Sequence, residues 1–543
     1  MAMQTDLRAA AAAWRDDDPD PATQAQLQAL LDQWPDSEAE LADRFAQPLT
    51  FGTAGLRGVL RAGPNGMNRA VVRAASRGLV SYLDSAGPAG PVVVGFDGRH
   101  GSREFADEAV AVFTGAGRRA LRLRTRLPTP VLAYAVRALD AAAGVMVTAS
   151  HNPPADNGYK VYLGGEDGRG GQIVPPVDAG IEAAIRTVGP LSAVPLGDAG
   201  EIIDDTLVES YVDAVAALVD PAAPKDITVA YTAMHGVGAE TLLGVFKKAG
   251  FAEPASVPEQ HHPDPDFSTV PFPNPEEPGA MDLVQALAAR TGADIAIAND
   301  PDADRCAVAV PTPAGWRILR GDEVGVLLAD HLLRLGRTGT YATTVVSSQL
   351  LQSIAAAAGQ PYAETLTGFK WIVRGGDETG VPLAYGYEEA LGYCVAPDLV
   401  RDKDGISAAV LIADLAARLK ADGRTLTDRL DELAAAYGLH RTDQLSVRVT
   451  DVAEIATMMA RLRSNPPSTL LGRPVTEITD RLPSADVLTV RAEGVRVVVR
   501  PSGTEPKLKA YLETVEPFAP DAGPRADRSL ATLRTEIATA LGL

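Results

Sequence analysis

Apolar strand patterns alternate with helical patterns along most of this chain, and this alternation constrains its fold more than any other feature. The first series contains, in order, a buried strand at 91–96, a helix at 102–117, a strand at 121–126, a helix at 131–139 and a strand at 143–150. Strands that alternate with helices predict a parallel or mixed sheet covered by helices.

The alternation restarts twice and then changes character. It restarts after the Pro-containing segment 221–226 and again near Gly321, whereas from about Asp443 the pattern becomes α+β. A chain of 543 residues has room for three or four domains at about 150 residues each. We therefore predict three successive α/β domains with mixed sheets and a smaller C-terminal α+β domain. The expected segments are a helical N-terminal appendage at 1–46, α/β domains at 47–215, 216–318 and 319–438, and the α+β domain at 439–543.

Composition excludes several classes of protein. The net charge of −20 makes nucleic acid and anionic membranes poor partners. The two cysteines, Cys306 and Cys394, are too few for a disulfide framework. Neither a signal peptide nor a stretch of 18 uncharged apolar residues is present, so we expect a cytoplasmic protein with no membrane partner. No obligate protein partner is evident.

An acidic turn is the most informative motif. Asp300, Asp302 and Asp304 lie within NDPDADR between two apolar strands. Three like charges in five residues need a compensating cation, and carboxylate oxygens suit Mg²⁺ or Ca²⁺. The spacing does not fit an EF-hand, because Arg305 stands where that loop requires glycine. The alternative is an ordinary solvated acidic turn.

A hydroxyl-bearing loop begins at the end of the apolar run AGVMV, residues 143–147. Ser150 and His151 lie in TASHNPPADNGYK, where Pro153 and Pro154 end the strand, and Lys160 closes the segment as a possible proton donor or acceptor. Loops at strand ends are the usual place for function in α/β folds. The flanking residues do not fit the nucleophile elbow of a hydrolase. A serine in a polar turn is the simpler alternative.

Four further segments offer groups for an anion or a sugar. RPSGTEPK, residues 500–507, suits a phosphate because glycine and hydroxyls surround an arginine, although a plain surface turn remains an alternative. Arg57 lies in the glycine-rich segment TFGTAGLRG, which could also be a linker. TGFKWI and GYEEALGY offer Lys370 and adjacent glutamates, which are ordinarily solvated but also suit sugar hydroxyls.

In this order, the segments resemble the α-D-phosphohexomutase superfamily, and FGTAGLRG, TGFKW, YEEALGY and KDGISA resemble its phosphoglucomutase/phosphopentomutase branch. The resemblance extends from Thr50 to about Leu512. It implies four domains around a central cleft, each of which contributes one loop. One position departs from the pattern, because Ala390 follows the glutamate pair where many phosphoglucomutases have serine.

The resemblance also implies a role for each candidate residue. Ser150 would be the phosphorylated serine, and it would bind one Mg²⁺ ion per active site together with Asp300, Asp302 and Asp304. His151 and Lys160 would assist proton transfer, while Arg57 and Arg305 would steady phosphoryl charge. The residues expected to meet the sugar or its non-reacting phosphate are Gly368, Phe369, Lys370, Glu388, Glu389, Lys403, Arg500, Ser502, Gly503 and Thr504.

We therefore predict a phosphosugar mutase that moves a phosphoryl group between O1 and O6 of glucose phosphate. A phosphoserine enzyme and a sugar bisphosphate would be the intermediates, with a sugar 1,6-bisphosphate as activator and small sugar phosphates as the partners. Ala390 and the branch resemblance leave a phosphopentomutase as the first alternative. A metal-dependent sugar phosphatase and a non-catalytic sugar-phosphate-binding module are alternatives from other classes.

Overall fold

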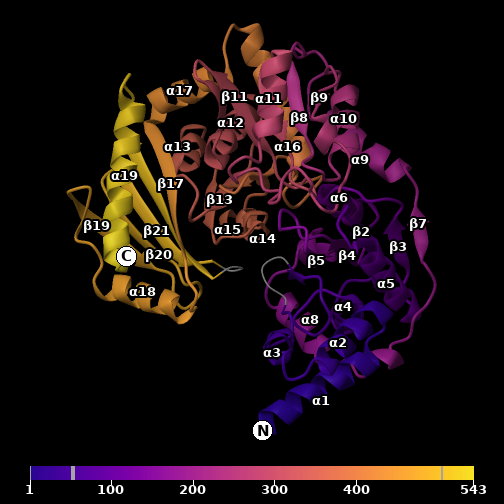
Figure 1. The fold of residues 1–543 in the computed structure, drawn as a ribbon. Helices are drawn as coiled ribbons and strands as arrows, with labels where there is room; N and C mark the ends of the chain where they lie inside the picture. Colours follow the sequence, from indigo (N-terminus) through magenta and orange to yellow (C-terminus); the bar gives the residue numbers. More distant parts are fainter. Residues whose placement is uncertain (1, 51–54, 503–505) are drawn as a thin grey trace. The chain divides into compact units, whose positions relative to one another are not determined.

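The computed structural model describes residues 2–50, 55–502 and 506–543, and it divides into two compact units. The first unit contains residues 1–318 and 392–418, and the second contains residues 319–391 and 419–543. Figure 1 shows the elements of both units along the chain.

Three N-terminal helices open the first unit: α1 (Ala2–Asp17), α2 (Pro21–Asp32) and α3 (Glu38–Arg44). Leu27 and Leu41 are fully buried in a small apolar cluster, which also includes Ala62 from the segment after the helices. The Asp17 carboxylate accepts hydrogen bonds from the backbone N–H groups of Leu191 and Ser192, at 2.7 and 3.0 Å. The predicted N-terminal helices are therefore packed against the domain that follows.

The first sheet has seven strands in the order β1-β5-β4-β2-β3-β7, with β6 paired to β5. Its strands are β1 (Leu56–Val59), β2 (Val92–Phe96), β3 (Ala120–Leu123), β4 (Ala143–Val147), β5 (Asp156–Leu163), β6 (Gly171–Gln172) and β7 (Glu201–Ile203). The accompanying helices are α4 (Arg69–Ser85), α5 (Ser102–Gly115), α6 (Thr129–Ala138), α7 (Gly165–Gly168), α8 (Val177–Ile185), η1 (Leu191–Ala193) and α9 (Thr206–Ala216). Every residue of β2, β3 and β4 is buried, as expected for parallel strands covered on both faces. Strand β5 then returns antiparallel to β4.

The second sheet has the order β12-β11-β10-β8-β9. Its elements are β8 (Val229–Thr232), α10 (Ala239–Lys248), β9 (Ala255–Ser256), η2 (Pro258–Gln260), α11 (Asp282–Thr291), β10 (Ile295–Ala298), β11 (Ala307–Thr312) and β12 (Gly315–Ile318). Strand β10 is parallel to β8 and antiparallel to β11, so the chain reverses in the tight turn between β10 and β11. The first unit also contains β16 (Gly392–Cys394) and most of α16 (Gly405–Ala421). Gly392 forms an antiparallel bridge with Arg305.

The second unit begins with a sheet in which β13 lies between β14 and β15, all parallel. Its elements are α12 (Gly321–Arg334), β13 (Thr340–Thr344), α13 (Leu350–Ala357), β14 (Tyr362–Thr365), α14 (Phe369–Ile372), α15 (Gly375–Thr379), β15 (Leu383–Glu388) and α17 (Leu426–Tyr437). The loops after the three parallel strands therefore leave from the same edge of the sheet.

The last sheet is antiparallel, with the order β17-β22-β21-β20-β19-β18. Its elements are β17 (Leu439–Arg448), α18 (Ala453–Ser464), β18 (Thr469–Leu470), β19 (Arg473–Asp480), β20 (Leu488–Ala492), β21 (Val495–Pro501), β22 (Lys507–Glu516) and α19 (Ala522–Leu541). Helix α19 runs along this sheet and buries Leu533 and Ile537 in the core that the sheet shares with α18 (Figure 1).

The predicted fold class is confirmed: three α/β sheets precede a C-terminal antiparallel sheet with its own helices. None of the helices in the described part of the chain is both long enough and apolar enough to cross a membrane.

Candidate active site

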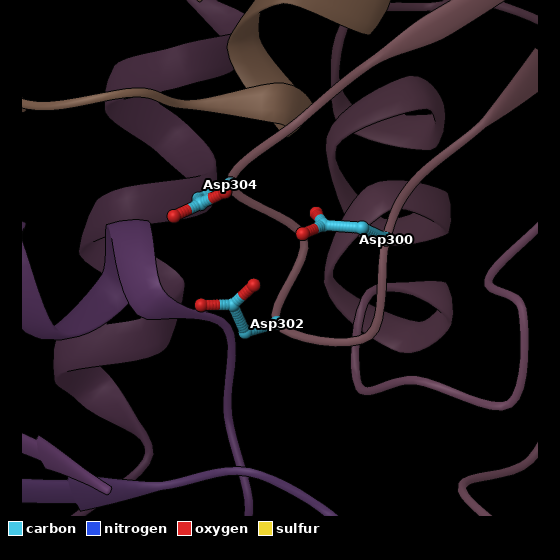
Figure 2. Close-up of side chains that lie close together, drawn as sticks. All are labelled: Asp300, Asp302 and Asp304. Atoms are coloured by element: carbon cyan, nitrogen blue, oxygen red, sulfur yellow. The ribbon is translucent and has the colours of Figure 1, made fainter. Parts of the chain in front are cut away.

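The acidic turn connects β10 to β11 at the carboxyl end of a parallel strand. Asp300, Asp302 and Asp304 are fully buried, and one carboxylate oxygen of each lies within 4.8 Å of the others. Figure 2 shows the three side chains extending from this one turn. Ala303 adopts a left-handed backbone conformation with φ of 55°, which keeps the turn tight. Among the described residues, these three form the one cluster whose ligand atoms are close enough to hold a metal ion.

Basic groups surround the three carboxylates. The Lys160 ammonium donates to Oδ2 of Asp302 at 2.7 Å and to Oδ2 of Asp304 at 2.9 Å. Lys403 Nζ lies 3.3 Å from the same oxygen of Asp304. These ion pairs compensate part of the negative charge that the buried turn concentrates.

The Ser150 loop meets this turn directly. Ser150 Oγ donates to Oδ2 of Asp300 at 2.9 Å and lies 3.2 Å from Nδ1 of His151. Ser150 is buried, and its φ of 52° is left-handed, a conformation that L-residues adopt mainly where the surroundings enforce it. The structure thus brings Ser150, His151, Lys160 and the acidic turn together within the first unit.

Arg57 approaches the same loop from β1. Its Nη1 donates to Oδ1 of Asn152 at 2.9 Å. Strand β1 pairs antiparallel with β5, the strand that follows the Ser150 loop. Gly55, which precedes this strand, has φ of 79°, and a Cβ there would lie 2.1 Å from the carbonyl oxygen of Tyr159. Glycine is therefore required at Gly55 for β1 to come this close.

Arg305 completes the cationic side of the turn. Its Nε lies 4.0 Å from oxygens of Asp300 and Asp304, while its backbone N–H donates to Asp300 at 3.0 Å. The carbonyl oxygen of Arg305 accepts a hydrogen bond from Asn299 at 2.6 Å. The turn is thus held by its own backbone as well as by ion pairs.

Burial and neighbouring charges shift the protonation equilibria of the turn. Burial, together with Asp302 and Asp304, raises the pKa of Asp300 well above its ordinary value. Burial also raises the pKa of Asp302, but Lys160 outweighs that effect and lowers the pKa below its usual range. The pKa of His151 is lowered well below its ordinary value by burial and by the charges of Arg305 and Arg57.

The sugar-loop candidates lie in the second unit, at the carboxyl ends of its parallel strands. Glu389 follows β15, and its Oε2 accepts hydrogen bonds from Thr344 at 3.2 Å and Ser347 at 3.0 Å. Burial raises the pKa of this carboxyl group. Glu388 ends β15 and is partly buried.

The other two loops of the second unit are described in part. Gly368 has φ of 109° and precedes the short helix α14, where Phe369 and Lys370 are buried. Arg500 lies on β21 opposite Lys509, and the Ser502 N–H donates to the Lys507 carbonyl oxygen at 2.8 Å. Gly503 and Thr504 lie outside the described residues.

Two residues at the site were not predicted from the sequence. Thr129, at the start of α6, donates from Oγ1 to Oδ2 of Asp302 at 2.7 Å. Arg99 donates to carbonyl oxygens of the Ser150 loop, at 2.6 Å to that of Ser150 itself. The sequence could have indicated Arg99, because it lies in DGR immediately after β2. The carboxyl end of this strand lies at the same edge of the sheet as the start of the serine loop.

Comparison with known proteins identifies four family domains in succession. Residues 48–190, 209–315 and 320–437 match alpha/beta/alpha domains I, II and III of phosphoglucomutase/phosphomannomutase, and residues 444–517 match its C-terminal domain.

Individual proteins show the same similarity. The chain is 47% identical to a probable phosphomannomutase of Haemophilus influenzae, over 82% of this chain and 93% of that protein. It is 34% identical to the phosphopentomutase of Mus musculus, over 95% of this chain and 92% of that protein. A crystal structure of a putative phosphomannomutase from Thermus thermophilus is 27% identical and superposes with a TM-score of 0.70, over 89% of this chain and 99% of that one.

Proposed function

The chain belongs to the phosphoglucomutase/phosphomannomutase family, and on that premise we propose that it transfers a phosphoryl group between two hydroxyls of a sugar through phosphorylated Ser150. One observation carries the proposal: the Ser150 hydroxyl lies 2.9 Å from Asp300, inside a buried cluster of carboxylates and cations. A nucleophilic hydroxyl beside a metal-binding turn is the arrangement that phosphoryl transfer needs.

The acidic turn fits Mg²⁺. Oδ1 of Asp302 and Oδ1 of Asp304 are buried and accept no hydrogen bond, so oxygens suited to a hard cation remain available beside Asp300. The ion would be held by these three carboxylates and by an oxygen of phosphorylated Ser150. When bound, it would neutralise negative charge on the phosphoryl group during transfer.

The reaction proposed for Ser150 has two half-reactions. First, the P–Oγ bond of phosphoserine breaks while a P–O bond forms to the free hydroxyl of a sugar monophosphate; the proton of that hydroxyl passes to a basic side chain, and the departing Ser150 Oγ takes up a proton. In the second half-reaction, Ser150 Oγ gives up its proton and accepts the other phosphoryl group of the bisphosphate, while the sugar oxygen that is released takes up a proton. His151, 3.2 Å from Ser150 Oγ, and Lys160 are the side chains to which we assign these proton transfers.

The cations around the turn would hold the charge of the phosphoryl group. Arg57 and Arg305 carry guanidinium groups, whose planar donors suit phosphate oxygens. Lys403 lies against Asp304 in the same unit. In the second unit, we assign the sugar to Gly368, Phe369, Lys370, Glu388 and Glu389, and the non-reacting phosphate to Arg500, Ser502, Gly503 and Thr504.

For the substrate, we assign interconversion of glucose 1-phosphate and glucose 6-phosphate, with glucose 1,6-bisphosphate as activator. Phosphopentomutase activity is the second candidate. It is favoured by Ala390, which removes a side-chain hydroxyl next to the glutamate pair, and by the relatedness to a phosphopentomutase over most of the chain.

The test compares kcat/KM for glucose 1-phosphate, mannose 1-phosphate and ribose 1-phosphate under the same conditions, with free phosphate measured in each reaction. A preference for the glucose ester supports the first assignment, and a preference for ribose or mannose phosphate replaces it. Release of free phosphate at the rate of sugar consumption would instead identify a phosphatase.

A further inference from the structure

The Ser150 loop has two backbone hydrogen bonds of its own, from the Asn152 N–H to the Ala149 carbonyl at 3.1 Å and from the Asp156 N–H to the Pro153 carbonyl at 3.1 Å. The N–H of Ser150 donates to Oγ1 of Thr148 at 2.8 Å. None of these three bonds involves the carbonyl oxygens of Ser150 and Asn152. Because buried carbonyl groups need donors and Ser150 is held at positive φ, another part of the protein must fix this loop.

A single guanidinium group does so. Arg99 donates to the carbonyl oxygens of Ser150 at 2.6 Å, Asn152 at 2.6 Å, Pro153 at 2.8 Å and Asp156 at 3.2 Å. Its side chain is 0% exposed. The planar fork of arginine can make these contacts at once, whereas a lysine ammonium on a flexible stem cannot span them.

The Asp97 carboxylate holds Arg99 in turn. Its Nε lies 3.4 Å from Oδ2 of Asp97, and the other oxygen of Asp97 accepts hydrogen bonds from the Arg99 N–H at 3.0 Å and from Ser102 Oγ at 2.7 Å. This carboxylate therefore sets both the charge environment and the direction of the guanidinium group.

An aromatic ring covers the guanidinium group from another part of the unit. The Phe267 ring centroid lies 4.9 Å from Arg99 Cζ, within the range of a cation–π contact. Phe267 belongs to the proline-dense segment 258–278. The helical structure in this segment is limited to the three-residue 3-10 helix η2. Next to it, Asp266 pairs with Nε2 of His100 at 2.8 Å.

We propose that Arg99 is a positioning residue of the transfer reaction: it holds the backbone of the Ser150 loop so that Oγ stays against the acidic turn, and Phe267 keeps Arg99 in place. The inference rests on the proposed function of Ser150. Arg99 acts through four carbonyl groups and does not contact the reacting atoms, so its effect belongs to the transfer step and not to sugar affinity.

The test compares Arg99→Lys with wild type and with Arg122→Lys. Arg122, on β3, is a matched control: like Arg99 it is a buried arginine of the first unit, but it pairs with Asp107, at 3.3 Å, instead of the loop. For each protein, Tm, kcat and KM for glucose 1-phosphate are measured, together with the rate at which glucose 1,6-bisphosphate phosphorylates Ser150, followed by intact mass in rapidly quenched samples.

We expect Arg99→Lys to slow phosphorylation of Ser150 and kcat by about 100-fold, with KM unchanged, because small misplacements of a reacting group cost this much. Arg122→Lys is expected to lower Tm and leave the phosphorylation rate at the wild-type value. If both variants slow phosphorylation in proportion to their loss of Tm, Arg99 has a structural role only and the proposal is overturned.

Phe267→Leu keeps an apolar group over Arg99 but removes the aromatic face, and it tests the proposal should Arg99→Lys fail to fold. We expect slower phosphorylation in the same direction, by about tenfold, with KM unchanged. If Ser150 of this variant is phosphorylated at the wild-type rate, the role of Phe267 in holding Arg99 is overturned. If wild-type protein itself takes no phosphate from the bisphosphate, the proposed function fails, whereas rapid phosphorylation of both wild type and the Arg99 variant refutes the positioning role alone.

Discussion

The hydroxyl of Ser150 donates a 2.9 Å hydrogen bond to Oδ2 of Asp300, although 150 positions separate the two residues in the chain. Each lies in a loop that follows a parallel strand, β4 in one sheet and β10 in the other. The two sheets belong to the same compact unit, so their strand ends can contribute to one site. This contact is what turns an acidic turn and a serine loop into a candidate transfer site.

Asp302→Asn is expected to weaken the response to Mg²⁺. Asparagine keeps the shape of the side chain but removes the charge that pairs with Lys160 at 2.7 Å. We expect the Mg²⁺ concentration for half-maximal activity to rise at least about tenfold, since losses in metal sites commonly reach 10–100-fold. The measurement is turnover against Mg²⁺ concentration after EDTA treatment.

Wild-type protein and Asp198→Asn serve as controls for that titration, because Asp198 is an exposed residue outside the site. Both should lose activity with EDTA and regain it with Mg²⁺. An unchanged Mg²⁺ requirement in the Asp302 variant would argue against this carboxylate as a ligand.

Gly405→Ala is expected to disturb the site from α16. A Cβ at this position would lie 2.2 Å from the carbonyl oxygen of Arg305 and 2.7 Å from Nδ2 of Asn299. The segment that carries Lys403 must then move away from the acidic turn. We expect a lower kcat and a loss of about 1–3 kcal/mol in unfolding free energy, measured by turnover and denaturant unfolding.

Gly189→Ala is the matched control, because a Cβ at Gly189 meets nothing within 4 Å. This variant should have wild-type activity and stability. Equal behaviour of the two glycine variants would contradict the close packing of α16 on the turn.

Glu513 provides a pH test within the second unit. Its carboxylate accepts hydrogen bonds from Ser348 at 2.7 Å and from Arg496 at 3.0 Å, and it lies 2.9 Å from Nδ1 of His440. Burial raises the pKa of Glu513, but Arg496 and His440 outweigh that effect and lower it from 4.5 to about 2. Because the pKa of Glu513 is lower in the folded than in the unfolded chain, its ionised carboxylate stabilises the fold at pH values above 4.5. This contribution disappears as the pH falls from 4.5 toward 2.

Glu513→Gln should therefore have a lower Tm than wild type near neutral pH, and the difference should narrow as the pH falls below 4.5. The difference between the two pKa values corresponds to a contribution of about 3 kcal/mol to the free energy of unfolding at neutral pH. Glu493→Gln, at an exposed position, should follow wild type at every pH. A Tm difference that stays constant with pH would show that the Glu513 charge is not the cause.

Much of the fold could be predicted because buried parallel strands have a strong local signal. The strands β2 and β4 and the helices α5 and α6 lie where the apolar patterns predicted them. The predicted ends of the strands were less accurate. The strand predicted at 121–126 ends at Leu123, and that predicted at 143–150 ends at Val147, where the chain turns into the serine loop. Helix α4 was not predicted, and its apolar face is interrupted by Gly78, which packs closely against Ile185.

The site was predictable where its residues cluster in the sequence and where the family resemblance supplied roles. Thr129 and Arg99 could not be predicted in the same way, because each acts on a residue brought near only by tertiary folding. Thr129 bonds to Asp302 from 173 positions away. The association of residues 392–418 with the first unit, which brings Lys403 to Asp304, is also a tertiary effect without a local pattern.

The central claim is that Ser150 carries the phosphoryl group between two positions of the sugar. The most direct test is intact-mass analysis with peptide mapping after incubation with glucose 1,6-bisphosphate and Mg²⁺, with Ser150→Ala and the exposed Ser210→Ala treated in parallel. We predict one phosphate on Ser150 that glucose 1-phosphate removes. We also predict none on Ser150→Ala, whose turnover should fall by several decades, up to about 10⁶-fold. Phosphate on another residue, or near-normal turnover without Ser150, would contradict the account.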